Sequence, residues 1–398
     1  MKKGPRLIPE WRLLLLAART SLTPEQIEGI RGLVRSGINW EFATRMAARH
    51  NLLPLLYLNL KKICWDELPT DITEALAGFF ITIEAKNLFL CYALEMLLDK
   101  FEAQGINAIP FKGPSLAISA YRALAARGFS DLDILIDRVD LKAACTTLKA
   151  NSYRPELDLG PEQLSAFACH EDNLAFYNED GVNIELHWEL SGLYLAKPVR
   201  LRDLQPSLTT IRLTEREVPH LPAVIQLVYL CVHGAKHMWE KIEWLSCIHE
   251  LTRSVPESEW TAALERAGSW QCRRMFLLGL SICRELLDTK LPELILKEIQ
   301  SDLRLPELSR QIKHQIFQGR PDDPAGELET RFSLFHLQVR DNLSDSIRYL
   351  LRLLFRPSSA EWHLLQLPGP LSFLLYCFRP MRLLYEGVGR MITRRSGR

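Results

Sequence analysis

The spacing of hydrophobic positions along this chain changes twice. Up to residue 104 apolar residues recur at helical spacing, and one helix should begin at Thr23-Pro24, a favourable N-cap followed by proline. Between 105 and 200, short apolar segments typical of strands alternate with helical ones. Helical spacing then returns. The pattern predicts an α+β protein in which helical regions flank a small mixed sheet.

The same changes predict four parts. An N-terminal helical region (1–104) precedes an α/β core (105–200), which is followed by a C-terminal helical domain (201–316). Residues 317–398 begin with a segment rich in Pro, Gly and Asp, as expected for a linker, and end as an apolar, basic tail. Strands of the core are expected at 106–113, 130–137 and on both sides of a turn at Asn178–Gly181.

The amino-acid composition excludes some classes of protein but does not indicate a function. The 398 residues carry 49 lysines and arginines against 48 acidic residues, so no strong field indicates a nucleic-acid partner. A hydrophobic content of 47% excludes global disorder. Nine scattered cysteines form no CxxC pair, which favours reduced thiols and a cytoplasmic location. Oligomeric state is not indicated.

The clearest chemical feature is a pair of acids inside an apolar strand. Asp131 and Asp133 flank Leu132 and therefore project from the same face of the strand. Two neighbouring carboxylates repel, and Mg²⁺, which prefers oxygen ligands, would relieve that repulsion. Without metal, neutralising Asp133 should leave stability unchanged or slightly higher. The pair alone leaves open two unrelated acids at a solvated strand end.

A third acid sits in a second alternating segment. In residues 182–188 the polar side chains Asn183, Glu185 and His187 alternate with apolar ones, so they share one face. Glu185 could complete a metal site if its strand lies beside the first. A histidine such as His187 is more typical of a structural hydrogen bond than of a metal ligand.

A strand-to-helix turn precedes the acidic pair by about 18 residues. It reads Phe111-Lys112-Gly113-Pro114-Ser115, and it should place Gly113 and Ser115 at the start of a helix. A helix N-terminus offers free backbone N–H groups and partial positive charge, which suit phosphate, and Lys112 adds a cation. An ordinary turn with an exposed lysine is the alternative.

Together these segments resemble a known family. The turn with Lys112, then Arg127 and "SDLDILI", and later "IELHW", are similar to the bacterial family labelled uncharacterised nucleotidyltransferase, of the polymerase-β-type superfamily. The likeness extends over roughly 40–300, including "HNLLPLLYLNL" and "HGAKHMWEKIEWL". Two positions depart from the expected pattern: Lys112-Gly113 replaces the superfamily's Gly-Ser, and Cys247 stands where an aspartate is expected.

The resemblance implies transfer of a nucleoside monophosphate from an NTP to a hydroxyl or phosphate acceptor, with Mg²⁺ or Mn²⁺ as cofactor. It implies metal binding and catalysis by Asp131, Asp133 and Glu185. It implies nucleotide binding by Lys112, Gly113, Ser115 and Arg127. The acceptor is left open as a small molecule, a sugar or a protein.

Alternatives remain at the level of function. The chain could be a catalytically silent nucleotide-binding adaptor, or an accessory protein of a surface-polysaccharide or peptide-modification pathway. His233 and His237 share a helix face and could join Cys247 or His249 around zinc, although a structural or substrate-facing cluster fits better. In the tail, 371–398, six arginines against one glutamate favour peripheral membrane contact, while a helix docked on its own core is equally consistent.

Overall fold

The computed structural model describes residues 7–190, 197–318, 334–365 and 367–396, with the side chains of the last helix described only to 386. Its centre is a five-stranded sheet in the order β1 (Ala108–Pro110), β2 (Asp131–Ile136), β5 (Asn183–His187), β4 (Asn173–Tyr177) and β3 (Arg154–Pro155). Strands β2 and β5 are parallel, whereas the other neighbours are antiparallel. The predicted α+β class with a small mixed sheet is confirmed.

Five helices precede the sheet: α1 (Pro9–Ala17), α2 (Pro24–Arg35), α3 (Trp40–Arg49), α4 (Leu53–Ile63) and α5 (Thr70–Ala103). As predicted, α2 begins at Pro24, and the Thr23 hydroxyl accepts a hydrogen bond from the Gln26 backbone N–H at 3.4 Å. Pro54 breaks no helix, because it occupies the first turn of α4, where its missing N–H costs nothing.

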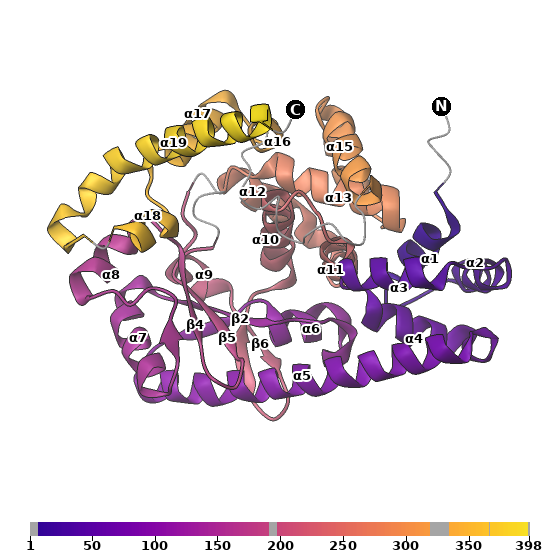
Figure 1. Cartoon of the computed structure of the whole chain (residues 1–398). Coiled ribbons are helices and arrows are strands. Elements are labelled where there is room, and N and C mark those ends of the chain that lie inside the picture. The colour runs from indigo at the N-terminus through magenta and orange to yellow at the C-terminus, as the bar shows by residue number, and fades with distance from the viewer. Residues whose placement is uncertain (1–6, 191–196, 319–333, 366, 397–398) are drawn as a thin grey trace.

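The long helix α5 runs along one side of the molecule beneath the sheet (Figure 1). It is the one described helix long and apolar enough to cross a membrane, and 22% of its most apolar window is buried. Leu90, Leu94, Leu98 and Phe101 pack into the core under the sheet. A long core helix passes the same length test, so this property alone is weak evidence for a membrane span.

The remaining elements follow in chain order. Around the sheet lie α6 (Gly113–Tyr121), α7 (Leu141–Ala150), α8 (Pro161–Phe167), α9 (Leu201–Leu204) and the hairpin β6 (Thr209–Arg212) with β7 (Glu217–His220). The C-terminal half comprises α10 (Ala223–Lys236), α11 (Ile242–Thr252), α12 (Trp260–Ser269), α13 (Arg273–Leu287), α14 (Glu293–Ser301), α15 (Leu305–Gln318), α16 (Leu334–Gln338), α17 (Leu343–Phe355), α18 (Ser359–Leu364) and α19 (Leu375–Ser396).

Two hydrophobic cores hold these elements together. One joins the N-terminal helices to α10–α15. The other lies on the apolar face of the sheet, where Leu132 and Ile184 pack with α5, α7 and α8, and it extends to Trp362 and Leu375 near the C-terminus. Helices from both ends of the chain therefore contribute to the core on this face of the sheet. Figure 1 shows α5 below the sheet and α18 near α8. The four-part division of the sequence stays a prediction.

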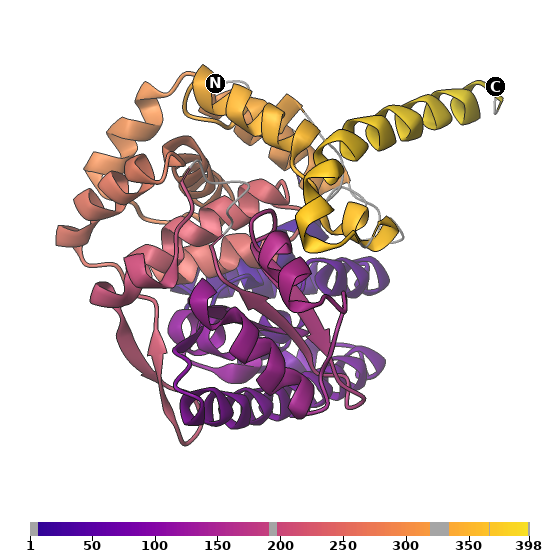
Figure 2. The same ribbon diagram turned by 90° about the vertical axis from the view of Figure 1, so that its left-hand side faces the viewer.

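The start of the basic tail is part of the folded body. Leu375 is fully buried, and Arg379 and Arg382 form ion pairs with the buried Glu361 at 2.8 and 2.6 Å. Deleting 371–398 would therefore remove core contacts as well as charge. The other four arginines of the tail lie outside the described side chains: Arg390, Arg394, Arg395 and Arg398. Figure 2 shows the far part of α19 projecting away from the body.

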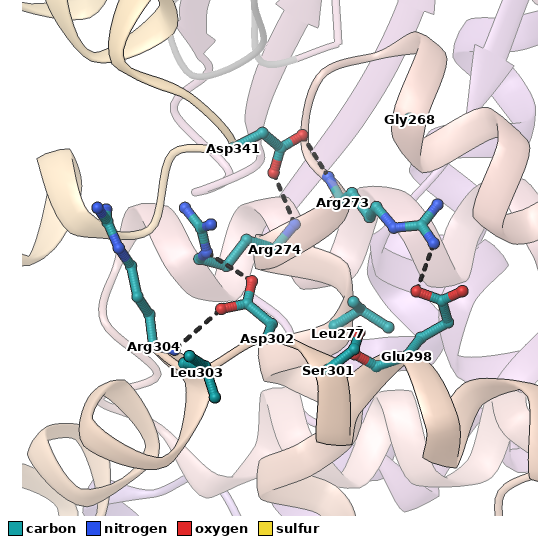
Figure 3. A pocket seen from close by; sticks show the side chains of 10 residues that line it. All are labelled: Gly268, Arg273, Arg274, Leu277, Glu298, Ser301, Asp302, Leu303, Arg304 and Asp341. Atoms are coloured by element: carbon teal, nitrogen blue, oxygen red, sulfur yellow. Dashed lines mark hydrogen bonds and ion pairs between the residues drawn. The ribbon is translucent and has the colours of Figure 1, made fainter.

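The N-terminus of α13 borders a cavity of about 500 Å³ (Figure 3). Asp341 accepts hydrogen bonds from the backbone N–H groups of Arg273 and Arg274 at 2.9 and 2.7 Å. The Arg274 side chain in turn donates to Asp302 at 2.7 Å. These contacts join the chain after α16 to α13 and α14. The Asp341 carboxylate therefore occupies the position at the start of α13 where an external anion would bind.

Replacing Asp341 by alanine should destabilise the protein by about 1–2 kcal/mol, the usual cost of losing a helix cap. Urea unfolding of the variant checks this, with Asp158→Ala as the control because the Asp158 side chain is 81% exposed in a surface pair with Lys149. An equal effect of the two substitutions would show that the cap is not what holds this segment.

Candidate active site

Parallel pairing of β2 with β5 brings the predicted acids together. Asp133 lies directly beside Glu185, and Asp131 lies beside Asn183. Since neighbouring strands are about 4.8 Å apart and paired residues project to the same side, the three carboxylates share one face. The alternation in the sequence predicts this shared face, but it does not give the register, which places Asp133 rather than Asp131 next to Glu185.

Asp133 is the most enclosed of the three acids. Its side chain is 1% exposed, and its Oδ1 accepts a hydrogen bond from Lys112 Nζ at 2.6 Å. His187 Nε2 lies 3.3 Å from the same oxygen. The other oxygen, Oδ2, is buried without a hydrogen-bond partner among the described residues. A buried carboxylate oxygen with no partner is costly unless a ligand completes it.

The neighbouring groups set the charge state of the pair on β2. Burial pushes the pKa of Asp133 upward, but the ammonium of Lys112 and the His187 contact outweigh it and hold the pKa below its usual range. Burial and then the Asp133 carboxylate raise the pKa of Asp131. The two acids therefore differ. The negative charge of Asp133 is balanced by Lys112, whereas the negative charge of Asp131 is disfavoured by burial and by the Asp133 carboxylate.

His187 connects the two strands. Its Nε2 lies 3.2 Å from Glu185 Oε2, and Asn173 of β4 donates to that same oxygen at 3.4 Å. Burial lowers the pKa of His187, but its hydrogen bonds to Asp133 and Glu185 raise it overall. The sequence identified His187 as a hydrogen-bonding histidine. What it did not give is that both of its partners are the candidate metal ligands.

These residues fit a divalent cation. Ligand atoms of Asp133, Glu185 and His187 lie within 4.8 Å of one another, and this is the one such group among the described residues. Asp131 adds a fourth group from the next position on the same face of β2. Mostly carboxylate oxygen with one imidazole suits Mg²⁺ or Mn²⁺. Asp133 Oδ2 is the atom that most needs such a ligand.

The strand-to-helix turn lies against the start of β2. Gly113 has φ +51°, and a Cβ there would stand 3.1 Å from the Asp131 carbonyl oxygen, so only glycine fits without strain. This geometry places Lys112 over the acids. Ser115 differs from the prediction in its surroundings: it is fully buried, and its hydroxyl bonds His220 Nδ1 of β7 at 2.8 Å.

Arg127 belongs to a buried hydrogen-bond network next to the acidic site. Its Nε donates to Glu243 of α11 at 2.5 Å, and the Cys247 thiol donates to the same carboxylate oxygen at 3.0 Å. Tyr121 contacts the Cys247 sulfur at 3.2 Å. The Arg127 charge lowers the pKa of Asp131, although burial dominates there. Cys247 thus has a structural partner in Glu243, which no sequence signal indicated.

Helix α10 packs beside the acidic face through Tyr229, which contacts Phe111 and Lys112. Lys112 Nζ lies 5.8 Å from the ring centre of Tyr229, and His233 continues this face one turn on. His233 and His237 pack against Trp244 of α11 with ring centres 5.2 Å apart in each case. They form an aromatic cluster, and the zinc grouping with Cys247 or His249 is not among the metal-binding geometries of the described chain.

Comparison with known protein families identifies the family of the chain. The sequence profile of one family, described as uncharacterised nucleotidyltransferase, matches residues 36–288, which is more than half of the chain. The chain belongs to that family. This membership supports a role in nucleotidyl transfer, and it confirms the resemblance found in the sequence. Searches of curated proteins and of solved structures gave no match.

For this nucleotidyltransferase-family chain, the matched residues include the whole site. The acids on β2 and β5, the Lys112 turn and the cluster on α10 and α11 all lie inside 36–288, whereas α14–α19 lie outside it. The family match therefore covers the sheet and the helices packed on it. The role of the C-terminal helices α14–α19 does not follow from the family.

Proposed function

We propose that this protein is a divalent-metal-dependent nucleotidyltransferase that moves a nucleoside monophosphate from an NTP to a hydroxyl or phosphate acceptor. The observation that carries the proposal is the acidic face of β2 and β5, where three carboxylates meet and Asp133 Oδ2 is buried without a partner. The acceptor stays open as a small molecule, a sugar or a protein.

The acids have separate roles in this scheme. Asp131 and Asp133 would hold a metal ion for the triphosphate, and Glu185 would add a carboxylate ligand on the side of the acceptor. When bound, Mg²⁺ or Mn²⁺ supplies charge neutralisation for the phosphates and for the attacking oxygen. His187 fixes the orientation of Asp133 and Glu185 through its hydrogen bonds.

The remaining residues position the nucleotide. Lys112 and the turn at Gly113 lie where phosphate oxygens can be held. The acceptor oxygen attacks the α-phosphorus, the bond from that phosphorus to the bridging oxygen breaks, and pyrophosphate leaves. Where the acceptor is a hydroxyl, its proton passes to Glu185. Arg127 contributes positive charge at the border of the site, while Ser115 supports the turn from within.

Nucleotide turnover tests the proposal directly. The full chain is incubated with each labelled NTP, Mg²⁺ and a cell lysate as the source of acceptors, and transfer of the label and release of pyrophosphate are measured. Both should occur with Mg²⁺ and stop when EDTA removes the ion. Glu185→Gln should reduce turnover by about 100-fold or more.

The control is Glu179→Gln, which changes the same side chain in the same hairpin at a position that is 86% exposed. It should keep full activity. NTP binding without turnover by any acceptor would favour the silent, nucleotide-binding adaptor instead. Full activity of Glu185→Gln would remove Glu185 from the site.

A further inference from the structure

A second cavity lies at the carboxyl end of the parallel strands, away from the acids. It has a volume of about 590 Å³ and is lined by residues of three regions. Arg138 follows β2, Glu189 follows β5, and α17 and α19 close the other side. Glu189 lies four positions after Glu185, at most about 13 Å along the chain.

The lining of this cavity is strongly basic. It contains one carboxylate, Glu189, against five guanidinium groups: Arg138, Arg200, Arg348, Arg352 and Arg356. Glu189 forms an ion pair with Arg200 at 3.2 Å. Among the described residues, Arg138 donates to the Cys169 sulfur at 2.9 Å and to a carbonyl at 3.5 Å. The Nε of Arg356 is buried without a hydrogen-bond partner among the described residues. Arg348 also pairs with Asp345 at 3.8 Å and donates to Gln271 at 3.1 Å. The lining itself carries five guanidinium groups for one carboxylate.

Packing concentrates these charges on one helix. Arg348 and Arg352 are one turn apart on the same face of α17, and Arg356 follows directly as the C-cap of that helix. Burial, then the charges of Arg356 and Arg348, lower the pKa of Arg352. Like charges held together this way are stabilised by a multivalent anion, and guanidinium groups bind phosphate oxygens in pairs.

An apolar rim adjoins the basic lining. Leu351 and Phe355 of α17 and Tyr376 of α19 line the cavity and are 52%, 47% and 40% exposed. Ile347 of α17 and Phe373 in the short segment before α19 are also exposed apolar side chains. A soluble anion needs no such rim, whereas an amphiphile places its charged end among the arginines and its chain along the apolar side chains. The far part of α19 projects from the body close to these elements (Figure 2).

We propose that the cavity between α17, α19 and the carboxyl end of β2 and β5 binds the phosphate head group of an anionic membrane lipid. The site would dock the protein on a membrane surface, with α17 lying in the interface. This proposal does not depend on nucleotidyl transfer, because none of its residues belongs to the acidic face.

Vesicle sedimentation of the full chain tests it. Vesicles of phosphatidylcholine alone are compared with vesicles that also contain phosphatidic acid, or phosphatidylserine at the same surface charge. We expect binding to phosphatidic acid above both others. Arg138→Gln with Arg356→Gln should lower that affinity about 30-fold, since each basic residue near an anionic surface contributes about 1 kcal/mol, or about fivefold.

The matched control is Arg154→Gln with Arg310→Gln, which removes the same charge from side chains that are 78% and 71% exposed elsewhere. An equal loss in both double variants would mean general charge attraction and overturn the site. Leu351→Ser with Phe355→Ser should weaken vesicle binding but leave binding of glycerol 3-phosphate unchanged. Tight binding of glycerol 3-phosphate without vesicle binding would assign the cavity to a soluble phosphate and overturn the lipid proposal.

Discussion

Replacing Asp131 by asparagine is expected to lower metal-dependent nucleotide turnover by about 100-fold or more while leaving the folded chain no less stable. The loss follows because a ligand charge is removed where the transferred phosphate is stabilised. Stability is kept because burial and Asp133 raise the pKa of Asp131, so its charge is unfavourable in the metal-free protein. Steady-state turnover and urea unfolding in EDTA measure the two effects.

The neighbouring acid should behave differently. Asp133→Asn should lose turnover to a similar degree, but it should also destabilise the metal-free protein by about 2 kcal/mol, because Lys112 loses its buried partner. The cost is below that of a fully uncompensated charge, since Asp131 and Glu185 remain close to Lys112. From the sequence, only the repulsion between the two acids could be considered, and no loss of stability was expected. If the two variants unfold alike, the ion pair contributes nothing.

Breaking the Arg127–Glu243 pair should give the largest change in stability. Glu243→Gln is expected to lower the free energy of unfolding by about 3 kcal/mol, because both side chains are at least 90% buried and Arg127 cannot lose its charge. Urea unfolding compares this variant with Glu179→Gln, whose partner Arg154 is 78% exposed, and where less than about 0.5 kcal/mol is expected.

The double variant Arg127→Met with Glu243→Met separates charge from packing. It should recover at least half of the stability lost in Glu243→Gln, because apolar side chains can replace a buried pair when both partners change. If the double variant is as unstable as the single one, the loss comes from the packing around Cys247 and Tyr121 and not from the unpaired charge.

Local signals predicted four of the five strands of the sheet, and the two-residue strand β3 (Arg154–Pro155) was not expected. The strands that carry the acids were found because their polar and apolar residues alternate, and α2 was found because Thr23 and Pro24 mark a helix start. The hairpin β6–β7 was missed, since Thr209–Arg212 and Glu217–His220 are short and half exposed. Their pairing depends on contacts with the sheet and α6, which no local pattern shows.

The residue types of the candidate site could be predicted from the sequence, but the contacts between them could not. Face and residue type follow from alternation, so Asp131, Asp133 and Glu185 could be named. Register, and with it the pairing of Asp133 with Lys112, is decided by how two strands about 50 residues apart align. Tyr229 and Glu243 lie in continuous helical patterns where nothing distinguishes a residue that faces the site from one that faces the core.

The contact between Lys112 and Asp133 has a consequence for the order of binding. An ion that binds Asp133 Oδ2 without a nucleotide is repelled by the Lys112 ammonium, which is held 2.6 Å from the other oxygen of the same carboxylate. An ion that arrives with a triphosphate brings oxygens to which that ammonium can turn. Nucleotide and ion should therefore strengthen each other's binding, and by thermodynamic linkage the factor is the same in both directions. The nucleotide-free protein should therefore bind Mg²⁺ weakly, and the affinity for Mg²⁺ should rise when a nucleoside triphosphate is present.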